Sequence, residues 1–168
     1  FAELVRRYQA PVIHFCQRMV GSVQEAEDLA QESFIRVYRH MGRLTPKAKF
    51  STVLFGIARN LALNALRDAK RQGRNTAQPL EEQPVEPVAP VETDRQARLK
   101  EIESALQQGL EKISPGHREI LLLREVQGMD YDALAKALHC RKGTVRSRLA
   151  RAREQLRQRL VELGGDWL

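Results

Sequence analysis

Apolar side chains recur at helical spacing along most of this 168-residue chain, and no stretch alternates as a β-strand would. The pattern predicts a first helix over residues 1–20, which Pro11 should kink or split. Gly21 ends that helix, and Ser22 with Glu25 forms a capping box that starts a second helix over 23–41. After a loop, a third helix with a clean apolar stripe is expected over residues 50–71.

Residues 73–96 interrupt this periodicity. The stretch holds four prolines, has few large apolar residues and carries more acids than bases, which is typical of an extended linker. About twenty such residues could span roughly 60–70 Å when fully extended. We therefore expect an all-α protein in which two small helical domains, 1–72 and 97–168, are joined by an acidic, proline-rich linker, 73–96.

Helical spacing resumes over residues 94–112. The apolar positions of this helix are Leu99, Ile102, Leu106 and Leu110. Ser114 as N-cap and Pro115 at the first helical position then predict a new helix, which Gly128 ends. We expect its buried face to consist of Ile120, Leu121, Leu122 and Val126.

The last stretch predicts two helices joined by a tight turn. A short helix over 131–138 breaks at His139, and a longer helix follows over about 141–160. From residue 141 to 159 there are eight Arg or Lys residues and a single acid, Glu154. A short bracing helix followed by a basic helix is the arrangement of a helix-turn-helix DNA-binding unit. A solvated basic face on an ordinary helical hairpin would explain this stretch equally well.

Charge and cysteine content narrow the classes of function. The net charge of +7 favours a polyanionic partner without identifying it. Cys16 and Cys140 fit no zinc spacing and are expected to be reduced thiols in a cytoplasmic protein, so a zinc site that adds His14 and His139 is disfavoured. No apolar run is long enough to cross a membrane, and we expect no membrane insertion, metal or cofactor.

Two polar helix faces are candidate binding surfaces. Asp28, Gln31 and Glu32 lie on neighbouring turns of the second helix, where acids either interact with the helix dipole or form a docking patch for a protein. On the third helix, amides and guanidiniums are spaced by four, three and four residues at Asn60, Asn64, Arg67 and Arg71. Such a row can donate hydrogen bonds to phosphates and base edges, and we slightly favour this role over a solvated surface.

Taken together, these stretches resemble a bacterial sigma factor of the extracytoplasmic-function (ECF) type, which carries only the second and fourth sigma regions. Residues 28–34, Asp-Leu-Ala-Gln-Glu-Ser-Phe, are similar to the family's Asp-Leu-x-Gln-Glu-x-Phe segment. Residues 50–60 resemble the segment that precedes the promoter-reading helix, and 114–128 and 143–153 are similar to the fourth region. The resemblance covers nearly the whole chain.

The resemblance implies a promoter-specificity subunit, not an enzyme, that binds the β′ and β subunits of core RNA polymerase and helps to open promoter DNA. Asp28, Gln31 and Glu32 would dock on the β′ clamp helices. The −10 element, as single-stranded DNA, would contact the loop 45–51 and the residues Lys49, Asn60, Asn64, Arg67 and Arg71. The −35 element, as duplex, would contact Arg141, Lys142, Thr144, Arg146, Ser147, Arg148 and Arg151. ECF relatives are commonly held inactive by an anti-sigma factor, so such a partner is expected too.

The chain departs from the family pattern at two positions. Val53 stands where the family usually carries a Trp, so we expect promoter melting either to be weaker or to rely on stacking by the nearby Phe55. His139 stands where the turn usually carries a Gly, so it must either tolerate a left-handed backbone conformation or shift the turn. The alternatives are a stand-alone helix-turn-helix regulator that binds duplex DNA as a dimer and, more distantly, a nuclease, for which a cluster of metal-binding carboxylates is missing.

Overall fold

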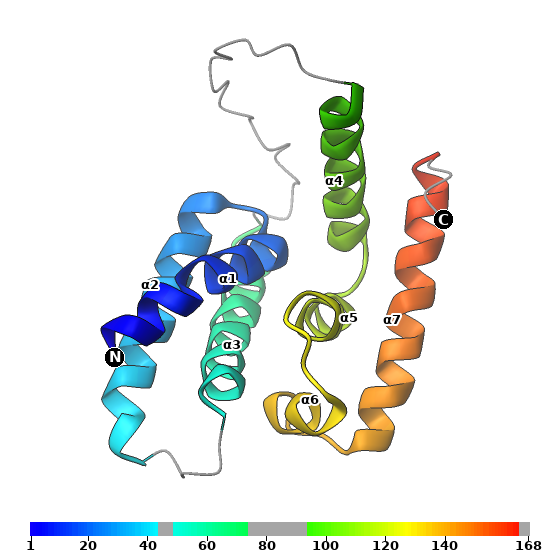
Figure 1. Cartoon of the computed structure of the whole chain (residues 1–168). Coiled ribbons are helices and arrows are strands. Elements are labelled where there is room, and N and C mark those ends of the chain that lie inside the picture. Colours follow the sequence, from blue (N-terminus) through cyan, green and yellow to red (C-terminus); the bar gives the residue numbers. More distant parts are fainter. Residues whose placement is uncertain (44–48, 74–93, 165–168) are drawn as a thin grey trace, which may run out of the picture.

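The structure is a computed structural model that describes residues 1–43, 49–73 and 94–164, and within these ranges every regular element is helical. The elements are α1 (Ala2–Val20), α2 (Val23–His40), the 3₁₀ turn η1 (Met41–Arg43), α3 (Phe50–Arg71), α4 (Asp94–Lys112), α5 (Pro115–Leu121), the π-helical segment η2 (Leu122–Val126), α6 (Tyr131–Ala137) and α7 (Lys142–Glu162). Figure 1 shows α1 to α3 packed as one bundle beside a second group, α4 to α7. The expected all-α fold is confirmed. Residues 44–48 and 74–93 lie outside the described parts, and α4 begins at Asp94, inside the range expected for the linker.

Local signals set the boundary between the first two helices. Gly21 adopts a left-handed φ of 86° and donates its N–H to the carbonyl of Gln17, which ends α1. The next residue, Ser22, accepts the N–H of Glu25 at 3.3 Å and so caps the start of α2. The sequence-based boundary is therefore confirmed at both residues.

Of the two outcomes expected of Pro11, a kink or a split of the first helix, the split is wrong, because α1 is continuous through this residue. Its ring removes one backbone donor, but the helix continues because both flanking segments pack on the same core. Val5 and Tyr8 before it are partly buried, and Val12 and Phe15 after it are buried. Tertiary packing thus outweighs the local cost of the proline.

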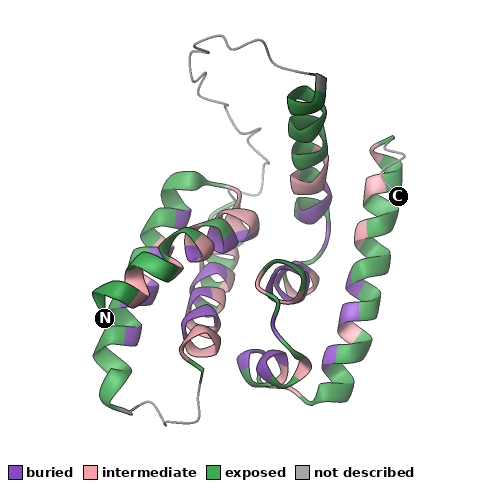
Figure 2. Ribbon diagram, viewed as in Figure 1, coloured by how far each residue is buried: buried purple, intermediate pink, exposed green. Residues whose placement is uncertain are grey.

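The N-terminal core lies where α1, α2 and α3 meet, and buried residues line the inner faces of these helices (Figure 2). At its centre the rings of Phe15 and Phe55 meet edge to face, with centroids 5.6 Å apart and an interplanar angle of 82°. Phe34 and Val37 complete the buried face of α2. Tyr38 continues the apolar spacing of that helix but is 63% exposed.

The helix that begins at Pro115 changes its winding before it ends. Ser114 caps α5 as expected, by accepting the N–H of His117. The chain then passes into η2, where Gln127 donates to the carbonyl of Leu122 five residues back. Each π turn holds an additional residue, which rotates the later side chains away from the directions they would have in an α-helix. Val126 is 62% exposed as a result, so the prediction that it is buried was wrong.

The two-helix unit at the C-terminal end forms as expected. The side chain of Asp130 accepts the N–H of Ala133 at 2.7 Å and caps α6. His139 has a φ of 49°, which confirms the left-handed turn conformation expected of it. Leu134 and Leu149 are buried between α6 and α7.

Helix α4 packs against the second half of α7 at a glycine. A Cβ at Gly109 would lie 3.1 Å from Leu156 and 3.2 Å from Leu160, so the absence of a side chain lets the two helices approach closely. Of the apolar positions of α4, Leu110 is buried, whereas Leu99 is 55% exposed. No helix within the described ranges is long and apolar enough to cross a bilayer.

The N-terminal and C-terminal groups of helices contact each other directly. Arg18 at the end of α1 lies 2.7 Å from the carboxylate of Glu103 on α4. The buried guanidinium of Arg118 donates to the carbonyl of Met19, and within its own half it donates to the carbonyls of Leu110 and Glu111. Burial lowers the pKa of Arg118, and the carboxylate of Glu111 opposes that shift.

Candidate protein and nucleic-acid interfaces

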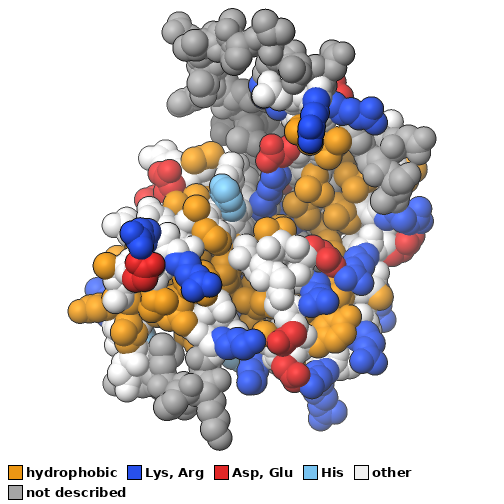
Figure 3. Space-filling view, viewed as in Figure 1, with side chains coloured by type: hydrophobic (Ala, Val, Ile, Leu, Met, Phe, Trp, Pro, Cys, Tyr) orange, Lys and Arg blue, Asp and Glu red, His pale blue; other side chains and the backbone are white. Residues whose placement is uncertain are grey.

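The start of α7 presents a basic surface to solvent. Val145, Leu149 and Ala152 face the core, so the side chains between them point outward. Figure 3 shows Lys and Arg side chains gathered over this end of α7 and over α6. All of the residues expected at the −35 element are exposed except Arg148, which is half-buried: Arg141, Lys142, Thr144, Arg146, Ser147 and Arg151.

Side chains of α6 hold parts of this basic surface in place. Lys142 Nζ lies 2.5 Å from Oδ1 of Asp132, and the guanidinium of Arg146 lies 5.9 Å from the ring centroid of Tyr131. The same ring has Arg124 at 5.3 Å. The first helix of the pair therefore braces the second through charge and ring contacts as well as through its core.

Asp130 brings the N-terminal half close to this unit. The N–H of Ala133 holds the pKa of the Asp130 carboxyl below its usual range, and the positive charges of Lys49 and Lys136 act in the same direction. Lys49 Nζ, on the other half of the chain, lies 3.8 Å from Oδ2 of Asp130. Lys49, a residue expected at the −10 element, thus pairs with Asp130, the N-cap residue of the first helix of the helix-turn-helix.

The polar row on α3 is present and exposed. Its members are Asn60, Asn64, Arg67 and Arg71. Arg67 donates to Oδ1 of Asn64 at 3.2 Å, so amide and guanidinium groups lie beside each other on one face. Phe55 lies on the opposite side and is only 2% exposed. The expectation that Phe55 could stack on melted DNA is therefore wrong, because its ring fills the core against Phe15.

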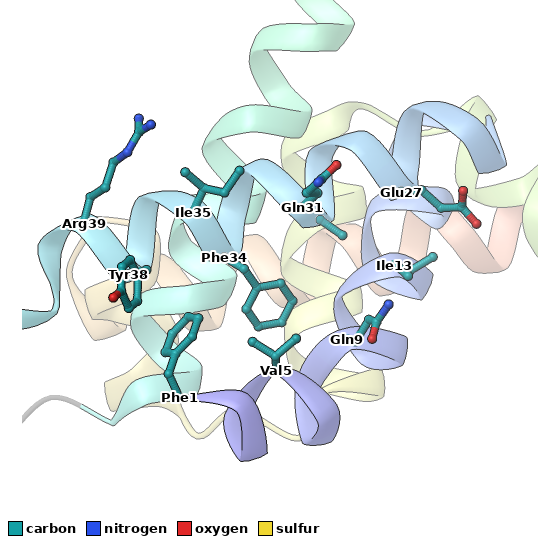
Figure 4. A pocket seen from close by; sticks show the side chains of 11 residues that line it. Phe1, Val5, Gln9, Ile13, Glu27, Gln31, Phe34, Ile35, Tyr38 and Arg39 are labelled. Carbon is teal, nitrogen blue, oxygen red and sulfur yellow. The ribbon is translucent and has the colours of Figure 1, made fainter.

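The acidic patch on α2 borders an apolar groove. Asp28 and Gln31 are exposed, and Glu32 is half-buried and accepts a hydrogen bond from Nε of Arg36 at 2.6 Å. The groove, of about 770 Å³, lies between α1 and α2 and includes Gln31 in its lining. In Figure 4 the side chains of Phe1, Val5 and Phe34 gather in it, and Glu27 and Arg39 stand near its two ends. A polar patch beside an apolar depression is typical of a protein-binding surface.

A buried cluster of charges was not foreseen from the sequence. Glu119 is 1% exposed, and its carboxylate accepts from Nε of Arg59 at 2.5 Å and from a second guanidinium nitrogen at 3.1 Å. Arg148 lies 3.9 Å from the same carboxylate. One sequence feature could have indicated this cluster. The charged pair at residues 118–119 directly precedes an apolar run, and the helical phase of that run turns the pair toward the core.

The cysteines and histidines show no arrangement for catalysis within the described residues. Burial raises the pKa of the Cys16 thiol to about 12, so this thiol remains protonated and unreactive at neutral pH. Cys140 is half-buried, and both cysteines are free thiols. Across residues 1–43, 49–73 and 94–164, no three His, Cys, Asp or Glu side chains are grouped to hold a metal ion.

Comparison with known proteins matches both halves of the chain. The family models Sigma-70 region 2 and Sigma-70, region 4 match residues 4–72 and 103–156. The RNA polymerase sigma-H factor of Pseudomonas aeruginosa is 34% identical over 97% of this chain and 87% of its own length. The ECF RNA polymerase sigma factor SigW of Bacillus subtilis is 32% identical over 97% of this chain and 90% of its own length.

Solved structures share the fold. The sigma factor RpoE from Bartonella quintana, in complex with the anti-sigma factor NepR, has a TM-score of 0.71 at 22% identity and covers 95% of this chain and 96% of its own. CnrH, in complex with the cytosolic domain of CnrY, has a TM-score of 0.66 at 22% identity and covers 98% of this chain and 89% of its own.

These matches decide between the alternatives. A stand-alone helix-turn-helix regulator would leave the match to residues 4–72 unexplained, and sigma factors are not enzymes. The chain belongs to the sigma-70 family as an ECF-type sigma factor, which binds RNA polymerase and promoter DNA for transcription initiation.

Proposed function

We propose that the chain docks on the β′ clamp helices of core RNA polymerase through Asp28, Gln31 and Glu32. The observation that carries this assignment is the position of the three residues: an exposed acid and amide on α2 beside an apolar groove that Gln31 helps to line. Apolar contact would supply affinity, and the polar rim would supply orientation. The fourth-region helices would engage the β subunit.

Promoter contacts divide between the two halves in this proposal. Asn60, Asn64, Arg67, Arg71 and Lys49 would bind the −10 element as melted non-template strand. Amides can hydrogen-bond to unstacked base edges, and the guanidiniums and the lysine neutralise phosphates. Because Phe55 is buried, melting would depend on these polar contacts and not on stacking against that ring.

The −35 element would be read as duplex by the exposed start of α7. The residues are Arg141, Lys142, Thr144, Arg146, Ser147, Arg148 and Arg151. An N-terminal helix end of this kind fits the major groove, where Arg can bind guanine in a bidentate manner and other cations contact phosphate. We place this work in the cytoplasm, together with the polymerase and the promoter.

The docking proposal predicts that an Asp28→Ala/Gln31→Ala/Glu32→Ala variant binds bacterial core RNA polymerase at least about tenfold more weakly than the wild type. The measurement is a titration of labelled sigma factor with core enzyme. A matched control, Glu3→Ala/Asp68→Ala/Gln72→Ala, also removes two acids and an amide from the N-terminal half, and it should bind like the wild type. Equal affinities of wild type and the first variant would rule out this docking site.

We further propose an anti-sigma factor as a second partner, since the similar sigma factor RpoE was solved with one. Such a partner would cover the α2 patch and the start of α7 together. In a complex with it, amide hydrogen exchange should slow in residues 26–34 and 145–153. A complex in which neither segment gains protection would refute this arrangement.

A further inference from the structure

The charges of α2 are divided between its two halves. Before Ser33 the helix carries acids and no base, and after Ser33 it carries bases and no acid. The acids are Glu25, Glu27, Asp28 and Glu32, and the bases are Arg36, Arg39 and His40. The helix dipole favours the same distribution in a single helix, so the charges alone do not indicate a partner. What indicates one is the apolar groove that lies between them.

The groove between α1 and α2 has one charge near each end. Glu27 and Arg39 both line it, and Figure 4 shows them near its two ends with apolar side chains between them. Both are exposed, and neither has an ion-pair partner among the residues that the structure describes. They lie about three turns apart, or roughly 18 Å along the helix axis. Each charge is therefore free to pair with a group on another molecule.

Large apolar side chains of α2 project into water along this groove. Ile35 is 37% exposed and Tyr38 is 63% exposed, although both belong to its lining. One row of lining residues spaced by four runs from an acid through an amide and an aliphatic side chain to a base: Glu27, Gln31, Ile35 and Arg39. Exposed apolar groups between charged ends are typical of an interface with a polar rim.

This row is complementary to its own reverse. When α2 packs antiparallel against α2 of a second copy, with a twofold axis at the middle of the row, Glu27 faces Arg39 of that copy and Gln31 faces its Ile35. The same contacts recur on the other side of the axis. Tyr38 then lies over the acidic end of the opposite groove, where its hydroxyl can donate to a carboxylate. A parallel arrangement would oppose like charges, which is unfavourable.

We propose that a second copy of this chain occupies the groove and that the two copies form an antiparallel dimer through α1 and α2. The dimer covers Gln31 and the neighbouring Asp28, so a chain within it cannot dock on core polymerase through these residues. This consequence rests on the docking site of the proposed function. The second copy and polymerase compete for one surface. By mass action, the concentration of chain that is free to bind polymerase rises less steeply than the total concentration.

Sedimentation equilibrium of the full chain measures the association. Between about 1 and 100 μM the wild type should change from monomer to dimer, as expected of a small interface. Glu27→Arg should weaken the dimer about tenfold or more, because an arginine then faces Arg39 of the second copy, and Arg39→Glu should weaken it similarly by opposing two carboxylates. The double variant Glu27→Arg/Arg39→Glu should return to the wild-type Kd, since it restores both ion pairs with their signs exchanged.

Two further variants separate the groove from the rest of the surface. Glu25→Arg reverses an exposed charge on the same helix outside the groove lining, so it should dimerise like the wild type. Tyr38→Ser removes an exposed ring from the lining and should weaken the dimer. Far-ultraviolet circular dichroism should show the same helix content in all variants, because each changed side chain lies at the surface.

Three results would overturn the dimer: a wild type that stays monomeric at the highest concentration, which would leave polymerase as the occupant of the groove, a Glu27→Arg variant that associates like the wild type, or a double variant as weak as the single ones. Adding core polymerase should dissociate the wild-type dimer, and polymerase carrying two copies would overturn the competition. Failure of the proposed docking site looks different. The triple-alanine variant would then bind polymerase like the wild type, while sedimentation of the free charge variants stays as expected.

Discussion

Replacing Phe55 by alanine is expected to lower the free energy of unfolding of the N-terminal half by about 3–5 kcal/mol. The ring is 2% exposed and meets Phe15 edge to face at 5.6 Å, so its removal leaves a cavity and also loses an aromatic pair. Urea unfolding followed by circular dichroism measures the change.

The matched control is Phe1→Ala. Phe1 is 39% exposed and borders the groove between α1 and α2, so its truncation should cost about 1 kcal/mol or less. If the two alanine variants were equally stable, Phe55 would not be a core residue. The prediction that it is unavailable to stack on DNA would then fail as well.

Replacing Arg118 by methionine is expected to lower the free energy of unfolding by about 3 kcal/mol. Methionine has a similar length but no donors, so the carbonyls of Met19, Leu110 and Glu111 would lose the hydrogen bonds that the guanidinium donates, although the Leu110 carbonyl would keep the one from the N–H of Ile113 at 3.4 Å. Two of these carbonyls lie in the last turn of α4 and the third lies in the last turn of α1. The backbone carbonyls of a last turn have no i+4 donor within the helix. Thermal and urea unfolding of the purified variant provide the measurement.

Arg118→Lys distinguishes the roles of charge and geometry. Lysine keeps the positive charge but lacks the planar fork that reaches several acceptors, so its stability should fall between those of the wild type and Arg118→Met. Arg157→Met is the control, because Arg157 is an exposed residue of α7 that pairs with Glu154 within the same helix. A loss below about 0.5 kcal/mol in Arg118→Met would show that water replaces the guanidinium at these carbonyls.

Helix positions were largely predictable because their signals are local. Ser22 and Ser114 cap the helices they were expected to cap, Gly21 ends α1, and His139 adopts the left-handed turn. Where packing overrides a local rule, the prediction failed, as with the alternative that Pro11 splits the first helix. Pro11 lies within a continuous helix because residues on both sides of it contribute to one core.

The exposed candidate surfaces were predictable for a related reason. A helix that buries one stripe must expose the opposite one, so the polar row of α3 and the basic start of α7 follow from periodicity. The contact between Arg59 and Glu119 could not be found in this way. The two residues are sixty positions apart, and neither helical period nor capping rules state which face of one bundle meets another. The burial of Phe55 was missed because α3 contacts α1 and α2 and also α6, so this helix buries a wider face than a single apolar stripe.

The π segment at 122–126 also makes this helix sensitive to changes in length. Before the segment the helix directs Arg118 and Glu119 toward the N-terminal half, and within it Leu123 is fully buried. The segment already holds more residues per turn than an α-helix, and a further insertion beside it would turn the following residues by about 100° relative to the preceding ones. Substitutions along this helix alter one contact at a time, whereas such an insertion would misalign Arg118 and Glu119 with the helix-turn-helix core. Natural variation in this helix should therefore consist of replacements at constant length.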